Sequence, residues 1–266
     1  MALPAPSPTS TALVTGASAG IGVEIARDLA RRGQGVTLVA RRIGPMEVLA
    51  KELAAAHGVR VEVVACDLSD AAARDALVED IAGRGLTVEI LVNNAGFSNS
   101  GPFATLDRES ELRMIRTNIE AVVDLTARYL PGMIERKRGA ILNVASTASY
   151  QPIPGQATYA ASKSFVLSFT EAVHAEAGGA GVTLTALCPG PVKTEFADVA
   201  GMTNVESSLP DFAWVPPAEV ARAGMAALAA GKRVVIPGPL NVATSVMGRL
   251  TPRGILLPLM KRFYPA

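Results

Sequence analysis

The sequence predicts an α/β fold in which helices cover both faces of a doubly wound parallel sheet. Short β-branched runs alternate along the chain with longer Ala-, Leu-, Arg- and Glu-rich runs of helical composition. Several of the short runs are almost wholly apolar, which is typical of strands that are buried on both faces. Strands that alternate with helices form parallel sheets through right-handed crossovers. We therefore expect a Rossmann-type sheet of about seven strands.

The expected elements follow one another without a linker. The strands are predicted at residues 11–15, 35–40, 59–66, 88–94, 139–146, 182–188 and 233–237. The helices are predicted near residues 20–32, 45–57, 70–83, 106–136, 156–178 and 216–230. Because no internal repeat and no Pro-, Gly- or Ser-rich stretch divides the chain, residues 1–266 are interpreted as one domain. Its core is expected at 11–237, followed by a C-terminal extension at 238–266.

The composition argues against several classes of protein. With 49% hydrophobic and 18% charged residues, the chain can form a core and is not expected to be disordered. A net charge of +1 gives no indication of nucleic-acid binding. Cys66 and Cys188 make neither a metal-ligand cluster nor a disulfide framework, so no metal is expected. The first residues lack the pattern of a secretory signal, and no apolar run is long enough to cross a membrane. These features predict a cytoplasmic protein.

A glycine-rich turn, TGASAGIG at residues 15–22, joins the first expected strand to the first expected helix. Gly16 allows the chain to leave the strand, and Gly20 and Gly22 allow close approach of a pyrophosphate and close packing of the helix on the sheet. The helix N-terminus offers N–H groups and a positive dipole to phosphates. The spacing departs from the common G-x-G-x-x-G pattern, and a tight turn without a ligand remains the alternative. The turn therefore predicts a dinucleotide site as a hypothesis.

The end of the second expected strand indicates which dinucleotide is preferred. NAD sites usually carry an acidic residue there, whereas this chain has Arg41 and Arg42. A guanidinium suits the 2′-phosphate of NADP, so NADP(H) is the preferred cofactor and NAD(H) the alternative, with ordinary surface arginines as the competing interpretation. Asp67, after the third strand, either accepts a hydrogen bond from the adenine amino group or caps the next helix. Ser69 and Asp70 compete for that capping role.

The chemistry is predicted from a helix at 156–178, which places Tyr159 and Lys163 one turn apart on one face. The ammonium is expected to lower the pKa of Tyr159 from about 10, making it a proton donor to a carbonyl or a base toward an alcohol. Ser146 ends the fifth strand, where such sheets bind ligands, and its hydroxyl can stabilise charge on a substrate oxygen. Asn118, unfavourable inside a helix without a function, is expected to hold a water that relays protons toward Lys163.

A solvent-facing pair is the alternative interpretation of Tyr159 and Lys163 taken alone, since such pairs are common on helices. The glycine turn and Ser146 count against that alternative. With these motifs together, residues from about 11 to 237 resemble the short-chain dehydrogenase/reductase family in its single-domain form. NNAG at 93–96 resembles the family's fourth-strand signature, and CPGPVKTEF at 188–196 resembles its Pro-Gly segment after the sixth strand.

The resemblance implies hydride transfer between a nicotinamide and a carbonyl or alcohol carbon. Asn118, Ser146, Tyr159 and Lys163 match the family's catalytic tetrad, in which Tyr159 exchanges the proton, Ser146 orients the oxygen, Lys163 tunes Tyr159 and binds ribose, and Asn118 supports the proton relay. The implied cofactor-binding residues are Gly16, Ser18, Gly20, Ile21, Gly22, Arg41, Asp67, Leu68, Asn94, Tyr159, Lys163, Val192 and Thr194. Family members are commonly dimers or tetramers, so a homo-oligomer is expected.

Residues 195–215 occupy the place of the family's substrate-covering loop. Gly201 is expected to permit motion of this loop. Its large apolar residues either line a cleft for a hydrophobic carbonyl compound or pack the loop on the core. These residues are Phe196, Met202, Leu209, Phe212 and Trp214.

The extension at 238–266 combines basic and apolar residues and contains no acidic residue. The basic residues are Arg249, Arg253, Lys261 and Arg262, and the apolar ones among them are Leu256, Leu257, Leu259, Met260, Phe263 and Tyr264. Packing over the cleft or against a sister subunit is favoured over contact with an anionic membrane. The reason is that Pro252, Gly254 and Pro258 are expected to interrupt any long amphipathic helix.

The sequence thus predicts an NADP(H)-dependent oxidoreductase that reduces a small hydrophobic ketone, aldehyde or 3-oxoacyl compound. An NAD-dependent alcohol or hydroxysteroid-type dehydrogenase is the nearest alternative. A non-catalytic, cofactor-sensing binding protein can share this fold, and a membrane-peripheral scaffold acting through the extension is a third alternative. The intact tetrad argues against the sensor, because sensing has no need of a tyrosine beside a lysine.

Overall fold

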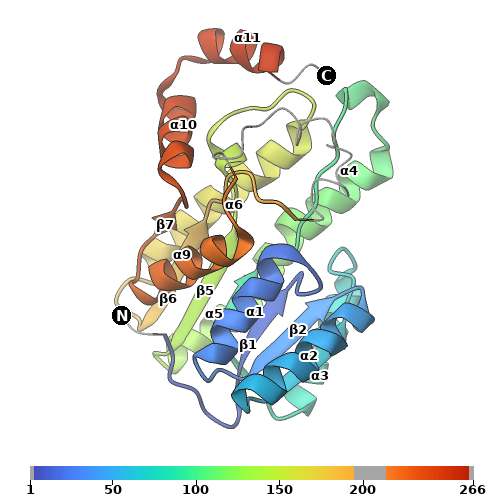
Figure 1. Cartoon of the computed structure of the whole chain (residues 1–266), viewed down its shortest axis with the longest axis vertical. Coiled ribbons are helices and arrows are strands. Elements are labelled where there is room, and N and C mark those ends of the chain that lie inside the picture. The colour runs from blue at the N-terminus through green and yellow to red at the C-terminus, as the bar shows by residue number, and fades with distance from the viewer. Residues whose placement is uncertain (1–2, 195–213, 264–266) are drawn as a thin grey trace.

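Seven short runs of the sequence form strands that pair into one parallel sheet (Figure 1). The computed structural model describes residues 3–194 and 214–263. The strands are β1 (Ser10–Thr15), β2 (Val36–Ala40), β3 (Val61–Ala65), β4 (Thr87–Asn93), β5 (Gly139–Val144), β6 (Val182–Leu187) and β7 (Val234–Val235). Their order in the sheet is β3-β2-β1-β4-β5-β6-β7, with parallel pairing throughout. The predicted Rossmann-type fold class is confirmed.

Helices cover both faces of this sheet. They are α1 (Gly20–Arg31), α2 (Ile43–His57), α3 (Ala71–Gly83), α5 (Ala121–Glu135), α6 (Ala157–Glu176) and α9 (Pro217–Ala229), while α4 (Arg108–Ile115) lies beyond the end of the sheet next to α6 (Figure 1). Asp70 and Asp107 cap α3 and α4, because their carboxylates accept hydrogen bonds from Ala72 N at 3.0 Å and Ser110 N at 2.7 Å. Helix α1 differs from these two, since Ala19 at its N-cap provides no side-chain acceptor.

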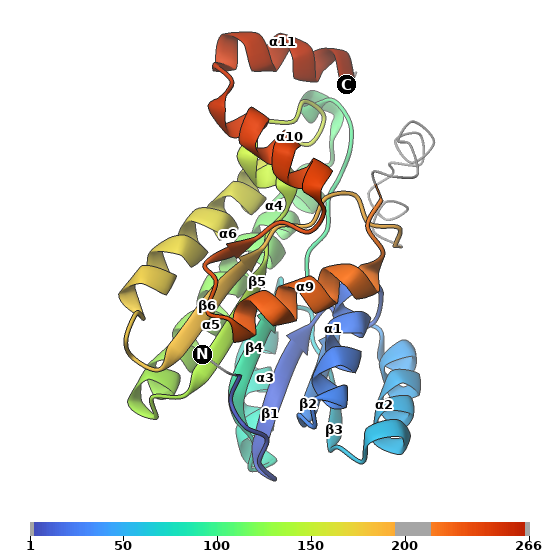
Figure 2. The ribbon, with the colours of Figure 1, turned by 60° about the vertical axis from the view of Figure 1, so that its left-hand side comes forward.

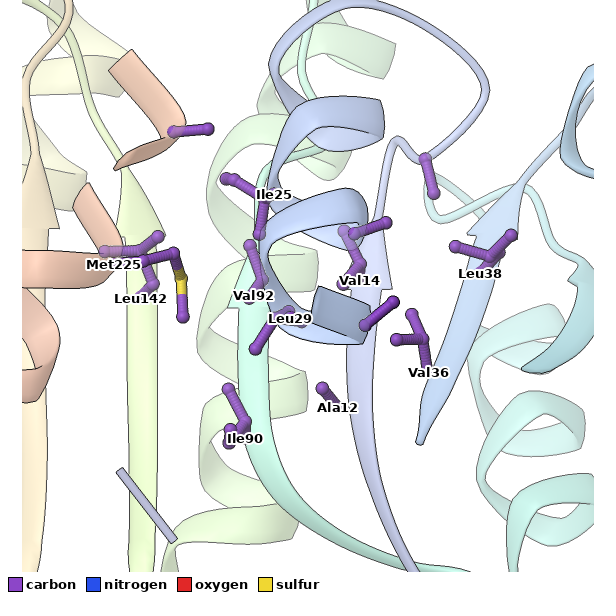
Figure 3. Packing of buried hydrophobic residues seen from close by; sticks show 14 of the residues in the cluster. Ala12, Val14, Ile25, Leu29, Val36, Leu38, Ile90, Val92, Leu142 and Met225 are labelled. Atoms are coloured by element: carbon purple, nitrogen blue, oxygen red, sulfur yellow. The ribbon is translucent and has the colours of Figure 1, made fainter. Parts of the chain in front are cut away.

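Alternate residues of each strand point to opposite faces, which explains why whole runs are apolar. Ala12 and Val14 of β1 pack with Leu29 of α1, in a cluster that includes residues of α2 and α9 (Figure 3). Leu13 lies between them in sequence but packs on the other face with Leu125 of α5, in a cluster that includes residues of α3 and α6. Each large side chain buried in this way contributes ~2 kcal/mol to stability.

One predicted helix, at 106–136, is interrupted in the structure. After a 3₁₀ turn at Phe103–Thr105, α4 runs to Ile115, a π-helical turn spans Arg116–Glu120, and α5 continues from Ala121. The prediction of one continuous helix is therefore wrong at this point, because the chain inserts an i→i+5 turn that periodicity does not reveal. Asn118 lies within the inserted turn.

The extension forms two further helices, α10 (Pro239–Leu250) and α11 (Arg253–Phe263), at one end of the molecule (Figures 1 and 2). The expected interruption occurs at Thr251 and Pro252, between the two helices. Pro258, however, lies inside α11 and does not end it. No helix in the described part of the chain is long and apolar enough to span a membrane.

Candidate active site

A cleft of about 540 Å³ is lined by residues that follow six of the strands, β1 to β6. The structure brings thirteen of the predicted site residues to this cleft: Gly16, Ser18, Gly20, Ile21, Arg41, Asp67, Leu68, Asn94, Ser146, Tyr159, Lys163, Val192 and Thr194. Gly22 and Asn118 are not among the lining residues. The positions agree with the predicted site, while the role of each residue stays a prediction.

The glycine turn at this cleft has a backbone that favours glycine at three positions. Gly16 and Gly20 have φ values of +65° and +58°. A Cβ atom on Gly22 would lie 2.4 Å from the carbonyl oxygen of Gly16. Asn94 braces the turn from the end of β4, because its Nδ2 donates to Thr15 O at 2.9 Å and to Gly16 O at 3.3 Å.

Helix α1 begins directly after this turn, with no side-chain cap at Ala19 and no acidic residue in its first turn. Its first residues, Gly20 and Ile21, line the cleft. An uncapped helix N-terminus that begins at a glycine of the cleft, where no side chain projects from the turn, fits a pyrophosphate. The residues present therefore fit a dinucleotide.

Arg41 and Arg42 are exposed and line the cleft next to the glycine turn. The Nη2 atom of Arg42 lies 3.5 Å from Ser18 Oγ, which is a long contact between the end of β2 and the turn. The two arginines thus bring positive charge to the cleft beside the glycine turn, and contact with a 2′-phosphate stays a prediction.

The choice between a cap and a ligand-facing role for Asp67 is settled in part by Asp70. Asp70 caps α3, so Asp67 is not needed for that purpose. The Oδ1 atom of Asp67 accepts hydrogen bonds from Ser69 N at 3.0 Å and Ser69 Oγ at 2.8 Å. Although burial opposes its ionisation, these hydrogen bonds and the charges of Arg41 and Arg113 lower the pKa of Asp67. An ionised carboxylate therefore lines the cleft.

Ser146 and Tyr159 meet at the carboxyl end of β5. Ser146 begins a 3₁₀ turn at Thr147–Tyr150, and its Oγ accepts a hydrogen bond from Ala148 N at 3.1 Å. The same side chain is hydrogen-bonded to the phenol of Tyr159. Burial raises the pKa of the Tyr159 phenol, and the hydrogen bond to Ser146 opposes that rise without cancelling it. At neutral pH the phenol is therefore a proton donor.

Lys163 is buried, with 5% of its surface exposed, and its Nζ donates to Val144 O at 2.8 Å. Burial lowers the pKa of its ammonium to about 8. The Nζ atom lies 5.9 Å from the centroid of the Tyr159 ring. The expectation of a lowered pKa for Tyr159 is wrong for this structure, because loss of hydration disfavours the phenolate and outweighs the hydrogen bond to Ser146.

Asn118 is buried in the π-helical turn, and its side-chain amide is hydrogen-bonded to the protein. Its Nδ2 donates to Phe97 O at 3.0 Å and to Ser162 Oγ at 3.2 Å, while its Oδ1 accepts from Phe97 N at 3.2 Å. A Cβ atom on Gly96 would lie 3.1 Å from Asn118 Oδ1 and 3.3 Å from Lys163 Nζ. The missing side chain of Gly96 thus lets Asn118 and Lys163 approach the same space. The predicted water relay stays a prediction.

Several residues at the cleft were not predicted from the sequence. Arg113 of α4 lies with its guanidinium carbon 5.5 Å from the centroid of the Phe97 ring, and both residues line the cleft. Gln151, Ile153 and Gln156 also line it, from the segment between the serine and the tyrosine of the site. The sequence of that segment contains no pattern that indicates which of its side chains point into the cleft.

Of the predicted substrate-covering loop, Phe196, Gly201, Met202, Leu209 and Phe212 lie outside the described residues. Trp214 is described and lines the cleft, with Lys193 Nζ 5.7 Å from the centroid of its ring. For Trp214, the structure therefore favours the first of the two expected positions, which is lining the cleft, over packing of the loop on the core. Within residues 3–194 and 214–263, no group of three or more His, Cys, Asp or Glu side chains is arranged to hold a metal ion.

Comparisons with known proteins agree with this geometry. A family model described as short chain dehydrogenase matches residues 10–203. A Streptomyces coelicolor protein named "Putative ketoacyl reductase" is 36% identical over 250 residues, which cover 88% of this chain and 95% of that protein.

Two solved structures are also similar. A short-chain dehydrogenase from Sphingobium yanoikuyae in complex with NADPH superposes with a TM-score of 0.80 at 33% identity, covering 95% of each chain. A single-residue variant of actinorhodin polyketide ketoreductase with NADPH gives a TM-score of 0.74 at 34% identity, covering 88% of this chain and 98% of that one.

Proposed function

The chain belongs to the short-chain dehydrogenase family of oxidoreductases, and on this premise we propose that it is an NADP(H)-dependent reductase of small hydrophobic ketones, aldehydes or 3-oxoacyl compounds. The observation that supports this function best is the meeting of three groups in one cleft. These are a glycine turn that fits a pyrophosphate, an arginine pair beside it, and the hydrogen-bonded pair of Ser146 and Tyr159.

In this proposal, the chain binds the cofactor along the cleft, from the arginine pair to Lys163. The start of α1 holds the pyrophosphate, Arg41 and Arg42 hold the 2′-phosphate, and Asp67 and Leu68 contact the adenine. Asn94 and Lys163 would hold the ribose that carries the nicotinamide, and Val192 and Thr194 would hold the nicotinamide carboxamide, since all four residues line the cleft. When bound, NADPH supplies the hydride.

The protein's own contribution is the proton and the placement of the carbonyl group. The neutral phenol of Tyr159 donates its proton to the substrate oxygen while the carbonyl carbon receives the hydride, so that C=O becomes CH–OH. The Ser146 hydroxyl donates a hydrogen bond to the same oxygen as negative charge develops there. Lys163, largely protonated below pH about 8, stabilises the phenolate that remains.

The substrate class is supported by the walls of the cleft and by the relatives. Ile153, Phe97 and Trp214 contribute apolar surface to the cleft, as a hydrophobic carbonyl compound requires. The names of two similar proteins, a ketoacyl reductase and a polyketide ketoreductase, support 3-oxoacyl thioesters as the first compounds to examine.

The test is turnover of NADPH with a panel of hydrophobic ketones, aldehydes and 3-oxoacyl thioesters. Tyr159→Phe is expected to lose about a hundredfold or more in kcat, as removal of a general acid predicts, while its Kd for NADPH stays unchanged. Tyr150→Phe is the matched control, because Tyr150 does not line the cleft and its hydroxyl contacts Cys188 Sγ at 3.8 Å. Full activity of Tyr159→Phe would contradict the proposed function.

A further inference from the structure

Helix α10 presents its large apolar residues to solvent and buries none of them against the protein. Asn241, Ser245 and Gly248, which follow one another at helical spacing, are buried. The opposite side of the helix carries exposed apolar residues: Leu240, Val242, Val246, Met247 and Leu250, of which Leu250 is 75% exposed. This is the reverse of the arrangement in a helix that covers a protein core.

The buried face of α10 is held by specific contacts, so the helix is not free to rotate. Asn241 Nδ2 donates to Pro237 O at 2.7 Å. A Cβ atom on Gly248 would lie 2.7 Å from Gln151 Oε1, so the helix backbone approaches this side chain closely. The apolar face is consequently fixed toward the outside.

Helix α11 adds to the same kind of surface. Leu256 and Met260 are buried against Ala148 and Ile153, beside the candidate active site. Ile255, on the other hand, is 64% exposed, and Leu257 and Leu259 are also exposed. We define the outer apolar surface as residues Leu240, Val242, Val246, Met247, Leu250, Ile255, Leu257 and Leu259. Such a surface on two consecutive helices marks an interaction site.

The charged residues of the segment that carries the outer apolar surface all have one sign. Arg249, Arg253, Lys261 and Arg262 are exposed, and residues 238–266 contain no aspartate or glutamate. If two copies of the chain met through this surface about a two-fold axis, these cations would face the same cations. An anionic lipid surface, in contrast, matches both the apolar residues and the positive charge.

We propose that α10 and α11 dock the protein on an anionic lipid bilayer, with the outer apolar surface in the interfacial region and the four cations at the headgroups. This inference does not rest on the proposed reaction. It does place the bilayer close to the cleft, because Leu256 and Met260 of α11 pack in the cluster that also contacts Tyr159.

The experiment is flotation of the full-length protein with vesicles of phosphatidylcholine alone and of phosphatidylcholine mixed with phosphatidylglycerol. The wild-type protein is expected to float with the anionic vesicles and to be released as NaCl is raised. Met247→Glu combined with Leu250→Glu should lower the bound fraction about tenfold or more, since both side chains are exposed and the fold tolerates the change. Val48→Glu is the matched control, because Val48 is 69% exposed on α2.

A second pair of variants tests the charges separately. Arg249→Gln combined with Arg253→Gln is expected to weaken binding to anionic vesicles about tenfold, whereas Arg222→Gln on α9 leaves it unchanged. NADPH binding, measured alongside, should be the same for all variants and shows that each is folded.

Absence of wild-type flotation, or equal flotation of the Met247→Glu/Leu250→Glu protein, would overturn the proposal. A wild-type dimer in sedimentation velocity that this double variant dissociates, without vesicle binding, would overturn it as well and assign the surface to a second copy.

Discussion

The glycine turn after β1 and the segment between Ser146 and Tyr159 line the same cleft but are built from different parts of the chain. The turn is defined by backbone geometry, with positive φ values at Gly16 and Gly20 and no room for a Cβ atom on Gly22. The other segment is supported by the distant helices α10 and α11, through contacts such as Gly248 with Gln151. A backbone that requires glycine can be recognised from the glycines in the local sequence. Packing between segments far apart in the chain produces no such local pattern.

The largest expected effect is a loss of NADPH affinity when the glycine turn is changed. Gly22→Ala should raise the Kd for NADPH about a hundredfold or more, because the new Cβ would lie 2.4 Å from Gly16 O and displace the turn. Gly83→Ala in α3 is the matched control, since a Cβ atom there meets nothing within 4 Å. Calorimetric titration with NADPH measures both. Unchanged binding by Gly22→Ala would mean that the turn does not hold the dinucleotide.

A second change tests how the segment after β3, on the cofactor side of the cleft, is joined to the π-helical turn that holds Asn118. Arg74, with 3% of its side chain exposed, donates to Leu68 O at 2.7 Å and to Asp124 Oδ2 at 2.6 Å and pairs with Glu120 of the π-helical turn. Arg74→Met should lower the free energy of unfolding by about 3 kcal/mol, because Leu68 O and Asp124 each lose a hydrogen bond from a buried charged group.

Urea unfolding measures this loss, with Arg128→Met as the control. Arg128 is 33% exposed and also pairs with Asp124, so its removal should cost less than about 1 kcal/mol. Equal losses for the two variants would show that Arg74 does not join the cofactor side to the turn that holds Asn118.

A third prediction concerns the buried ammonium of Lys163. Its pKa is lowered from 10.5 to about 8 on folding, so between these values the unfolded chain binds more protons and stability rises with pH. Below pH 8 the full cost of about 3 kcal/mol is present. The stability advantage of Lys163→Met over the wild type should therefore shrink by about that amount as the pH rises from below 8 to above 10.5. Urea unfolding across this pH range measures the difference in free energy of unfolding between Lys163→Met and the wild type. If that difference did not change with pH, the burial of a charged Lys163 would be contradicted.

The smallest effect is expected where α10 approaches the cleft. Gly248→Ala places a Cβ atom 2.7 Å from Oε1 and 3.3 Å from Cβ of Gln151, so it should cost about 1 kcal/mol of stability and change the substrate KM severalfold. The Kd for NADPH should not change, because the glycine turn is untouched. Gly254→Ala is the control, since a Cβ atom there meets nothing within 4 Å. Steady-state kinetics with the best substrate of the panel separates KM from kcat, and an altered NADPH affinity would contradict the division into two regions.

The strands, their parallel pairing and most of the cleft residues could be predicted from the sequence, because each left a local pattern. The apolar runs, the glycine spacing and the separation of Tyr159 from Lys163 are of this kind. The π-helical turn around Asn118 could not be predicted, since one extra residue in a turn hardly alters periodicity. The direction of the Tyr159 pKa shift was missed because burial depends on the whole fold. The outward apolar face of α10 was missed because sequence alone does not tell which face of a helix is covered.

The most direct measurement is a titration with NADPH and, separately, with NADH, in which nicotinamide fluorescence reports binding. It compares the wild-type protein with the double variant Arg41→Ala/Arg42→Ala. The proposed function predicts that the wild type binds NADPH about tenfold or more tightly than NADH, and that the double variant loses this preference by binding NADPH more weakly. Arg222→Ala should behave as the wild type. Tighter binding of NADH, or an unchanged preference in the double variant, would contradict an NADP(H)-dependent reductase at this cleft.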